Sequence, residues 1–165
     1  MALIIENGTG VDNANSYISV AEARSFASLR SLILPSSDSA VEVLIVKAFD
    51  YLESLDYKGN HANPPQSAEF PRRDLYLQGV LFAQNEIPNK LKQAQSQLTY
   101  EAVNTDLQPT GNGKEVIKEK VDVVEVQYSE KGINVARPTF TTVNSFLKDL
   151  LKSGLSSGHL ITTRV

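Results

Sequence analysis

Basic and aromatic side chains alternate at one place in the 165-residue chain, the segment Phe70-Pro71-Arg72-Arg73, with Tyr76 just beyond it. Aromatic rings stack on unpaired bases and arginines bind phosphates, so this composition is typical of proteins that hold single-stranded DNA. A single arginine pair, however, supplies few of the phosphate contacts that such binding needs. The alternative interpretation is structural: the phenylalanine fills a core and the arginines bind neighbouring carboxylates. Both interpretations stay open from the sequence.

Acid–base catalysis is the second chemistry to consider, because Asp50, Glu53 and Asp56 recur on one predicted helix. Paired carboxylates can serve as general acid and base. These three alternate with an apolar stripe, which is the pattern of a solvated helix face. The histidines, His61 and His159, fall in a proline-rich loop and in a tail, and no nucleophile motif such as G-x-S-x-G occurs. We expect no catalytic residues and no enzyme activity.

Metal and nucleotide sites are not predicted. The chain has no cysteine and only 2 histidines, far apart, which excludes a thiolate zinc site and argues against a histidine-rich one. The segment Gly111–Lys114 resembles half of a phosphate-binding loop, but Glu115 follows it where serine or threonine is needed. No strand–loop–helix pattern surrounds it, so a flexible loop is the better interpretation. We therefore expect no metal and no cofactor.

Charge and hydropathy restrict the partners. The formal net charge is −3, whereas proteins that coat nucleic acid by bulk charge are usually basic. Acidic side chains outnumber basic ones over residues 1–70, and the reverse holds over residues 137–165. This asymmetry suits contacts between copies or with an acidic partner, and chance is the alternative interpretation. No signal peptide or membrane span is expected, so we predict a soluble protein made in the cytoplasm, with no membrane contact.

Apolar periodicity and capping motifs predict about four helices. A capping box at Ser19–Glu22 opens the first helix, which runs to about Arg30. A second box at Ser39–Glu42 opens the strongest amphipathic helix, which we expect to be central and to end near Asp56. The third helix starts at Ile87-Pro88, because proline is well suited to a first helical position.

The third and fourth helices are predicted from an apolar stripe and from an N-cap. The third is predicted to bury one stripe and to leave a face that is polar but weakly charged, made of Lys90, Lys92, Gln93, Ser96 and Gln97. The fourth covers about 143–151, where Thr139 or Thr141 can supply the N-cap.

Two segments read as strands. Residues 75–77 and 80–82 flank Gln78-Gly79 and could form a small hairpin. Residues 115–128 alternate β-branched and charged side chains, which predicts one long strand or a hairpin that turns near Asp122. The predicted fold class is mainly α with a β-hairpin (α+β): a small bundle of about four helices with a protruding hairpin. Residues 1–154 form one domain, and residues 155–165 form an extended C-terminal tail.

Several short motifs occur along the chain: Ile5–Gly10, Asn13–Ala23, Phe70-Pro71-Arg72, Ile87-Pro88 with Lys92 and Ala94, Lys118–Val121 and Glu125–Tyr128. In their order and spacing they resemble a family of tailed-phage neck proteins that is often labelled DnaT-like single-stranded-DNA-binding protein. Its layout is similar to that of head–tail connector (adaptor) proteins. The aromatic-Pro-Arg triplet departs from the family in its first residue, where tryptophan is commoner than phenylalanine.

The resemblance implies a non-enzymatic virion protein. Adaptors of this kind form a ring, typically of twelve copies, beneath the portal protein. The ring extends the DNA channel and provides the docking surface for the tail or for the next neck component, a tail-terminator or stopper protein. Double-stranded DNA passes through without sequence-specific binding. The expected location is the virion neck, after assembly in the host cytoplasm. The alternative function is a single-stranded-DNA-binding accessory protein that uses Phe70, Arg72, Arg73 and Tyr76.

The connector hypothesis predicts two sets of contact residues. An extended tail is a natural added strand for a partner's sheet, so residues 160–165 are predicted to bind the portal. Strands this charged usually face solvent on one side or meet another subunit. The 115–128 hairpin is therefore expected at subunit borders or in the lumen of the ring, and ring contacts would also use the polar face of the third helix. The portal-binding residues are Leu160, Ile161, Thr162, Thr163, Arg164 and Val165; the hairpin residues are Lys118, Lys120, Glu125, Gln127 and Tyr128.

Overall fold

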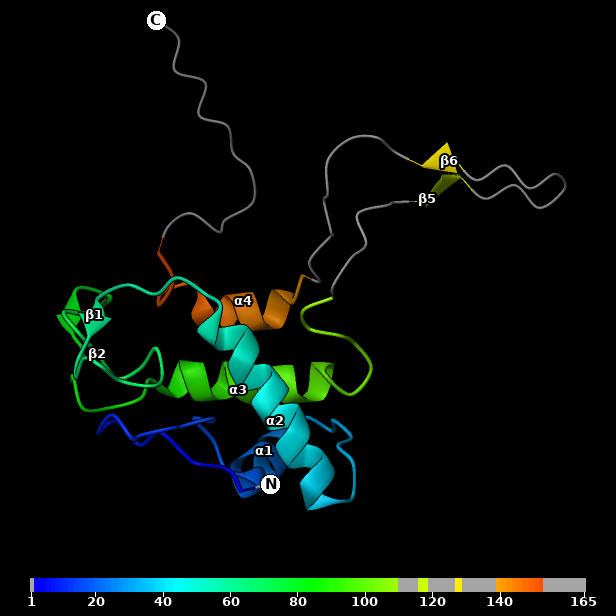
Figure 1. Ribbon diagram of the computed structural model, residues 1–165, viewed down its shortest axis with the longest axis horizontal. Coiled ribbons are helices and arrows are strands. Elements are labelled where there is room, and N and C mark those ends of the chain that lie inside the picture. The colour runs from blue at the N-terminus through cyan, green and yellow to red at the C-terminus, as the bar shows by residue number, and fades with distance from the viewer. Residues whose placement is uncertain (1, 110–115, 119–126, 129–138, 153–165) are drawn as a thin grey trace, which may run out of the picture.

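The computed structural model describes residues 2–109, 116–118, 127–128 and 139–152, and within them four helices surround a mostly apolar core (Figure 1). Three short antiparallel strand pairs accompany the helices. The predicted fold class, mainly α with added β structure, is confirmed. No helix in these ranges is long and apolar enough to cross a bilayer. The elements are α1 (Val20–Ser28), α2 (Asp38–Glu53), β1 (Asn60–His61), β2 (Arg72–Arg73), β3 (Tyr76–Leu77), β4 (Val80–Leu81), α3 (Asn89–Glu101), β5 (Val116–Lys118), β6 (Gln127–Tyr128) and α4 (Thr141–Leu147).

The capping box at the start of α1 is confirmed. The Glu22 amide donates to Ser19 Oγ at 3.2 Å, and the Ser19 amide donates to Glu22 Oε2 at 2.7 Å. Two amides that lack partners within the helix are thereby satisfied.

Replacing Ser19 with alanine is expected to lower the free energy of unfolding by about 1 kcal/mol, because a helix N-cap is lost. Urea denaturation followed by circular dichroism measures this change. Replacing the exposed Ser25 on the same helix with alanine removes no cap and should leave the stability within about 0.5 kcal/mol.

The second predicted capping box is wrong. The helix α2 begins at Asp38, one residue before the predicted box, and its N-cap Ser37 makes no side-chain capping bond. The Asp38 carboxylate instead accepts hydrogen bonds from Arg24, at 3.0 Å from Nε and 2.7 Å from Nη2. The helix also ends earlier than expected, at Glu53, where the backbone bonds change: the amides of Ser54 and Leu55 donate three residues back, to the Tyr51 and Leu52 carbonyls. The Tyr57 hydroxyl also donates to the Leu52 carbonyl, at 3.0 Å.

The central helix is α3, not α2 as predicted. It packs against α1, α2 and α4 (Figure 1). Its predicted apolar stripe is buried, but so are Gln95, Ser96, Gln97 and Thr99. The polar face that the resemblance assigns to ring contacts is therefore partly enclosed within the domain.

The buried Gln95 explains how α3 tolerates a polar core position. Its side-chain oxygen accepts from the Tyr17 amide at 2.9 Å. Its side-chain nitrogen donates to Ser16 Oγ and to the Ile45 carbonyl, each at 3.2 Å. A buried amide with all these partners is satisfied and links three segments of the chain.

The fourth helix is held by apolar packing and by the chain that follows α2. Neither predicted threonine caps α4; Phe140 occupies the N-cap position without a side-chain bond. Val143, Leu147 and Leu150 are buried. The Lys58 amide donates to the Leu150 carbonyl at 2.9 Å. This contact ties the end of α4 to the loop that carries the candidate site.

Both predicted strand pairs are present. The small hairpin pairs Tyr76 with Leu81 and Leu77 with Val80. In the 115–128 segment, β5 and β6 are antiparallel, with Val116 opposite Tyr128. A further pair that the sequence did not predict, β1 with β2, closes the loop between residues 60 and 73.

Candidate interaction surface

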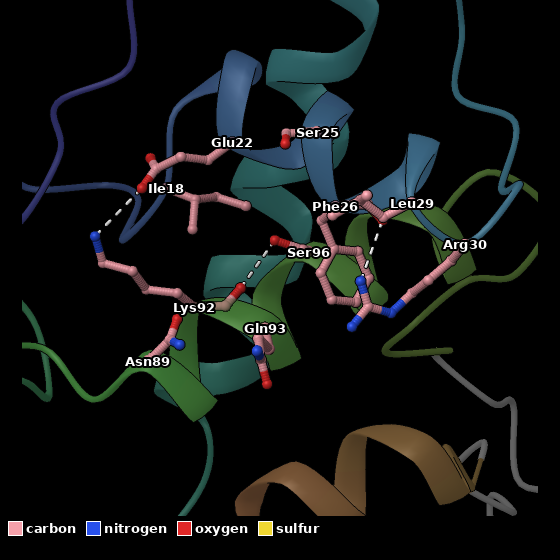
Figure 2. Close-up of a pocket in the computed structure, with 10 residues that line it drawn as sticks. All are labelled: Ile18, Glu22, Ser25, Phe26, Leu29, Arg30, Asn89, Lys92, Gln93 and Ser96. Carbon is pink, nitrogen blue, oxygen red and sulfur yellow. Dashed lines mark hydrogen bonds and ion pairs between the residues drawn. The ribbon is translucent and has the colours of Figure 1, made fainter.

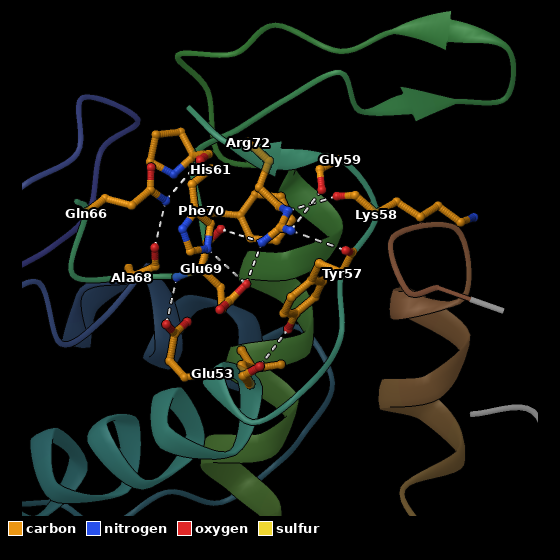
Figure 3. Close-up of polar contacts among 12 residues, drawn as sticks. Glu53, Tyr57, Lys58, Gly59, His61, Gln66, Ala68, Glu69, Phe70 and Arg72 are labelled. Atoms are coloured by element: carbon orange, nitrogen blue, oxygen red, sulfur yellow. Dashed lines mark hydrogen bonds and ion pairs between the residues drawn. The ribbon is translucent and has the colours of Figure 1, made fainter. Parts of the chain in front are cut away.

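Arg72 is a structural residue. Its side chain is almost fully buried on β2. Its Nε donates to the Lys58 carbonyl at 2.8 Å, and its Nη2 donates to the Gly59 carbonyl at 3.0 Å and the Tyr57 carbonyl at 3.3 Å. Its Nη1 donates to both the carbonyl and the carboxylate of Glu69. One guanidinium thus joins the two ends of the loop between α2 and β2, as Figure 3 shows.

Phe70 fills the core beneath this loop. It is fully buried, and its ring meets those of Tyr57 and Tyr17 edge-on, with centroids 5.0 Å and 6.3 Å away. Such edge-to-face pairs add to the stabilisation from burial. For Phe70 and Arg72 the structural interpretation therefore holds, and their place in the DNA-binding set is corrected: neither side chain is accessible to a nucleic acid.

Glu53 occupies the same network, although its spacing indicated a solvated face. Its Oε1 accepts from the Tyr17 hydroxyl at 2.5 Å, and its Oε2 accepts from the Glu69 amide at 2.7 Å (Figure 3). Burial raises the pKa of the Glu53 carboxyl to about 7; the charges of Glu69 and Asp50 add to the rise, and these two hydrogen bonds oppose it. No local signal in the sequence marks this partnership, since Tyr17 and Glu69 lie far from α2 along the chain.

The β3–β4 hairpin and the residue before it expose apolar and basic side chains. Tyr76, Val80 and Leu81 are 60%, 70% and 57% exposed; these three side chains are called the hairpin patch below. Arg73 is exposed just before them and makes no ion pair within the described residues. Of the four candidate nucleic-acid residues, the structure thus presents only Arg73 and Tyr76 at the surface.

A second exposed apolar region lies at the end of α1. Leu29 is 81% exposed and Ile33 is 82% exposed. Leu29 stands at the rim of a groove of about 310 Å³ between α1 and α3, called the α1 groove below (Figure 2). Its lining includes Glu22, Phe26, Arg30, Lys92 and Ser96.

The α1 groove contains one ion pair and one arginine that makes no ion pair within the described residues. Lys92 Nζ lies 3.3 Å from Glu22 Oε1, so these two form an ion pair. The Arg30 guanidinium carbon lies 3.7 Å from the centroid of the Phe26 ring, a cation–π distance. Arg30 has no carboxylate partner within the described residues, so its charge is available at the groove.

The other predicted site residues are only partly covered. Lys118, Gln127 and Tyr128 belong to β5 and β6, while Lys120 and Glu125 lie outside the described residues. The predicted portal-binding residues 160–165 also lie outside them. Within the described ranges, no three histidine, aspartate or glutamate side chains gather in a way that could hold a metal ion.

Comparison with protein families gives a match along the whole chain. The family model described as "Putative DnaT-like ssDNA binding protein" matches residues 1–165. Searches of curated proteins and of solved structures gave no significant match. The chain belongs to the family of putative DnaT-like ssDNA-binding proteins.

Proposed function

We propose that this chain is a head–tail connector protein of a phage virion, which forms a ring beneath the portal and provides the docking surface for the tail or the next neck protein. The observation that carries the proposal is the presence of two separate exposed apolar regions, the hairpin patch and the end of α1. The resemblance of several sequence motifs to phage neck proteins supports the same conclusion. The portal contact, the copy number and the virion location in this proposal depend on that resemblance.

Two different regions are what a ring requires. In a head-to-tail assembly each subunit uses one surface toward its predecessor and a different one toward its successor. In Figure 1 the segment from β1 to β4 (green) and the connection between α1 and α2 (light blue) lie on opposite sides of the helices. Large apolar side chains exposed at both places favour burial against another copy.

The charge of the chain suits a channel wall better than a binding groove. The net charge is −3. Of the two candidate arginines, Arg72 is buried and donates its hydrogen bonds to the surrounding loop. A channel wall along which DNA passes does not need positive charge that binds phosphates tightly. The proposal therefore has no catalytic step, cofactor or sequence-specific contact with DNA.

Single-stranded-DNA binding is the second candidate, and the family description favours it. The structure leaves it one cation and one ring on strands that follow one another along the chain, Arg73 on β2 and Tyr76 on β3. Such a site would bind weakly, because affinity for nucleic acid grows with the number of phosphates neutralised.

Fluorescence anisotropy with a labelled oligonucleotide at low salt separates the two candidates. The connector proposal predicts a flat titration. DNA binding predicts an affinity that falls steeply with salt and is lost when Arg73 and Tyr76 are both replaced by alanine. Arg30→Ala, which changes an exposed arginine elsewhere, is the matched control. A salt-sensitive affinity that only the first pair of substitutions removes would refute the connector as the primary function.

Deleting residues 155–165 tests the predicted portal contact. We expect the truncated chain to keep the helical circular dichroism of the full chain and to lose docking onto portal-bearing capsids, as followed by co-sedimentation. Full docking of the truncated chain would show that the tail assignment is wrong.

A further inference from the structure

The hairpin patch is rigidly presented. The two residues of its turn, Gln78 and Gly79, have φ values of 52° and 82°. Positive φ at both positions is the signature of a type I′ turn, whose twist matches that of the strands. The β3–β4 hairpin therefore holds its apolar side chains without the ordering cost that a flexible loop would incur on binding.

The α1 groove can receive such a tip. Its volume is about 310 Å³. Phe26 and Ile18 lie in its wall but are themselves buried, so Leu29 at the rim supplies most of the exposed apolar surface (Figure 2). Insertion of Val80 and Leu81 would cover exposed apolar area on both partners.

Charge at the two surfaces is complementary. Arg30 in the groove lacks a carboxylate partner within the described residues. Beside the hairpin patch, the exposed Asp74 carboxylate accepts one long hydrogen bond from the described part of the chain, from Asn60 Nδ2 at 3.4 Å. A carboxylate that approaches the groove with the hairpin can pair with this guanidinium, which also fixes orientation.

We propose that the β3–β4 hairpin of one copy inserts Val80 and Leu81 into the α1 groove of the next copy, with Asp74 meeting Arg30. This inference rests on the proposed ring and names its subunit contact. The contact joins two different surfaces, so repeating it propagates head to tail and closes into a ring where the rotation allows. The occupant of the groove is thus a second copy of this chain.

Disulfide cross-linking tests the contact on a clean background, because the chain contains no cysteine. Leu29→Cys and Val80→Cys are made as separate full-length variants at highly exposed positions, where neither change disturbs the core. The two are mixed and oxidised. We expect a covalent species at twice the 18.1 kDa chain mass in the mixture, and at least a tenfold lower yield from either variant alone. A single chain that carries both substitutions should give a ladder of higher oligomers.

Matched controls fix the outcome. A mixture of Leu29→Cys with Val103→Cys, a partly exposed position just after α3, should not cross-link. No cross-link between positions 29 and 80 would overturn the hairpin–groove contact. If the chain still sediments as an oligomer in that case, the proposed ring stands with another interface. A cross-link from Leu29→Cys to Thr162→Cys in preference to Val80→Cys would overturn the contact in favour of the tail as occupant.

Discussion

Replacing Arg72 with alanine is expected to lower the free energy of unfolding by about 3–5 kcal/mol, the range found when one partner of a buried ion pair is removed. The substitution leaves the Glu69 carboxylate without its guanidinium. It also removes the donors to the carbonyls of Tyr57, Lys58 and Gly59. Urea denaturation monitored by circular dichroism measures the loss.

The neighbouring arginine is the matched control. Arg73 is exposed and makes no ion pair within the described residues, so Arg73→Ala should change the stability by no more than about 0.5 kcal/mol. Arg72→Lys should remain strongly destabilised, because an ammonium cannot reproduce the planar fork that reaches both ends of the loop. Equal stability of the Arg72→Ala and Arg73→Ala variants would contradict the structural role of Arg72.

Glu53 should make stability fall as pH rises from about 4.5 to 7. Its pKa is raised from 4.5 to about 7 in the folded protein, so the folded state binds more protons than the unfolded state in this window. The contribution is fully present below pH 4.5 and is lost by pH 7, with a size on the order of 3 kcal/mol. Denaturation curves recorded across this range measure the slope.

Glu53→Gln separates titration from packing. The amide keeps the size of the carboxyl group but carries no charge, so the part of the slope due to this residue should vanish whatever the absolute stability. Glu86→Gln, at an exposed position, should leave the slope unchanged. An unchanged slope in the Glu53→Gln variant would show that another group titrates.

The helices and the small hairpin could be predicted because their signals are local. Ser19 and Glu22 cap α1 through neighbours in the sequence, and β3 pairs with β4 across a turn in which Gly79 readily adopts the positive φ. The second capping box failed because Arg24, from another helix, binds Asp38 and takes over the start of α2.

The site was harder to predict because its partners are distant in sequence. The sequence posed the right alternatives for Phe70 and Arg72, but burial decides between them, and burial depends on Tyr17 and on the loop after α2. Similarly, α3 appeared to have an exposed polar face, since no periodicity reveals that Gln95 has partners on two other segments. Long-range contacts of this kind override local pattern.

The family description and the exposed apolar side chains suggest different binding partners for this protein. The family description names single-stranded DNA, while the most exposed large apolar side chains lie in two places, the hairpin patch and the end of α1. The two substitutions that remove exposed candidates, Arg73→Ala and Tyr76→Ala, are therefore more informative than changes at Phe70 or Arg72, which would act through unfolding.

Electron microscopy of the purified full-length chain, added to portal-bearing capsids filled with DNA, tests the central claim most directly. The claim is that this protein works by fitting against copies of itself and a capsid vertex. The predicted result is a closed ring of added density at the portal vertex. Capsids without added density, together with chain bound along free single-stranded DNA, would contradict it.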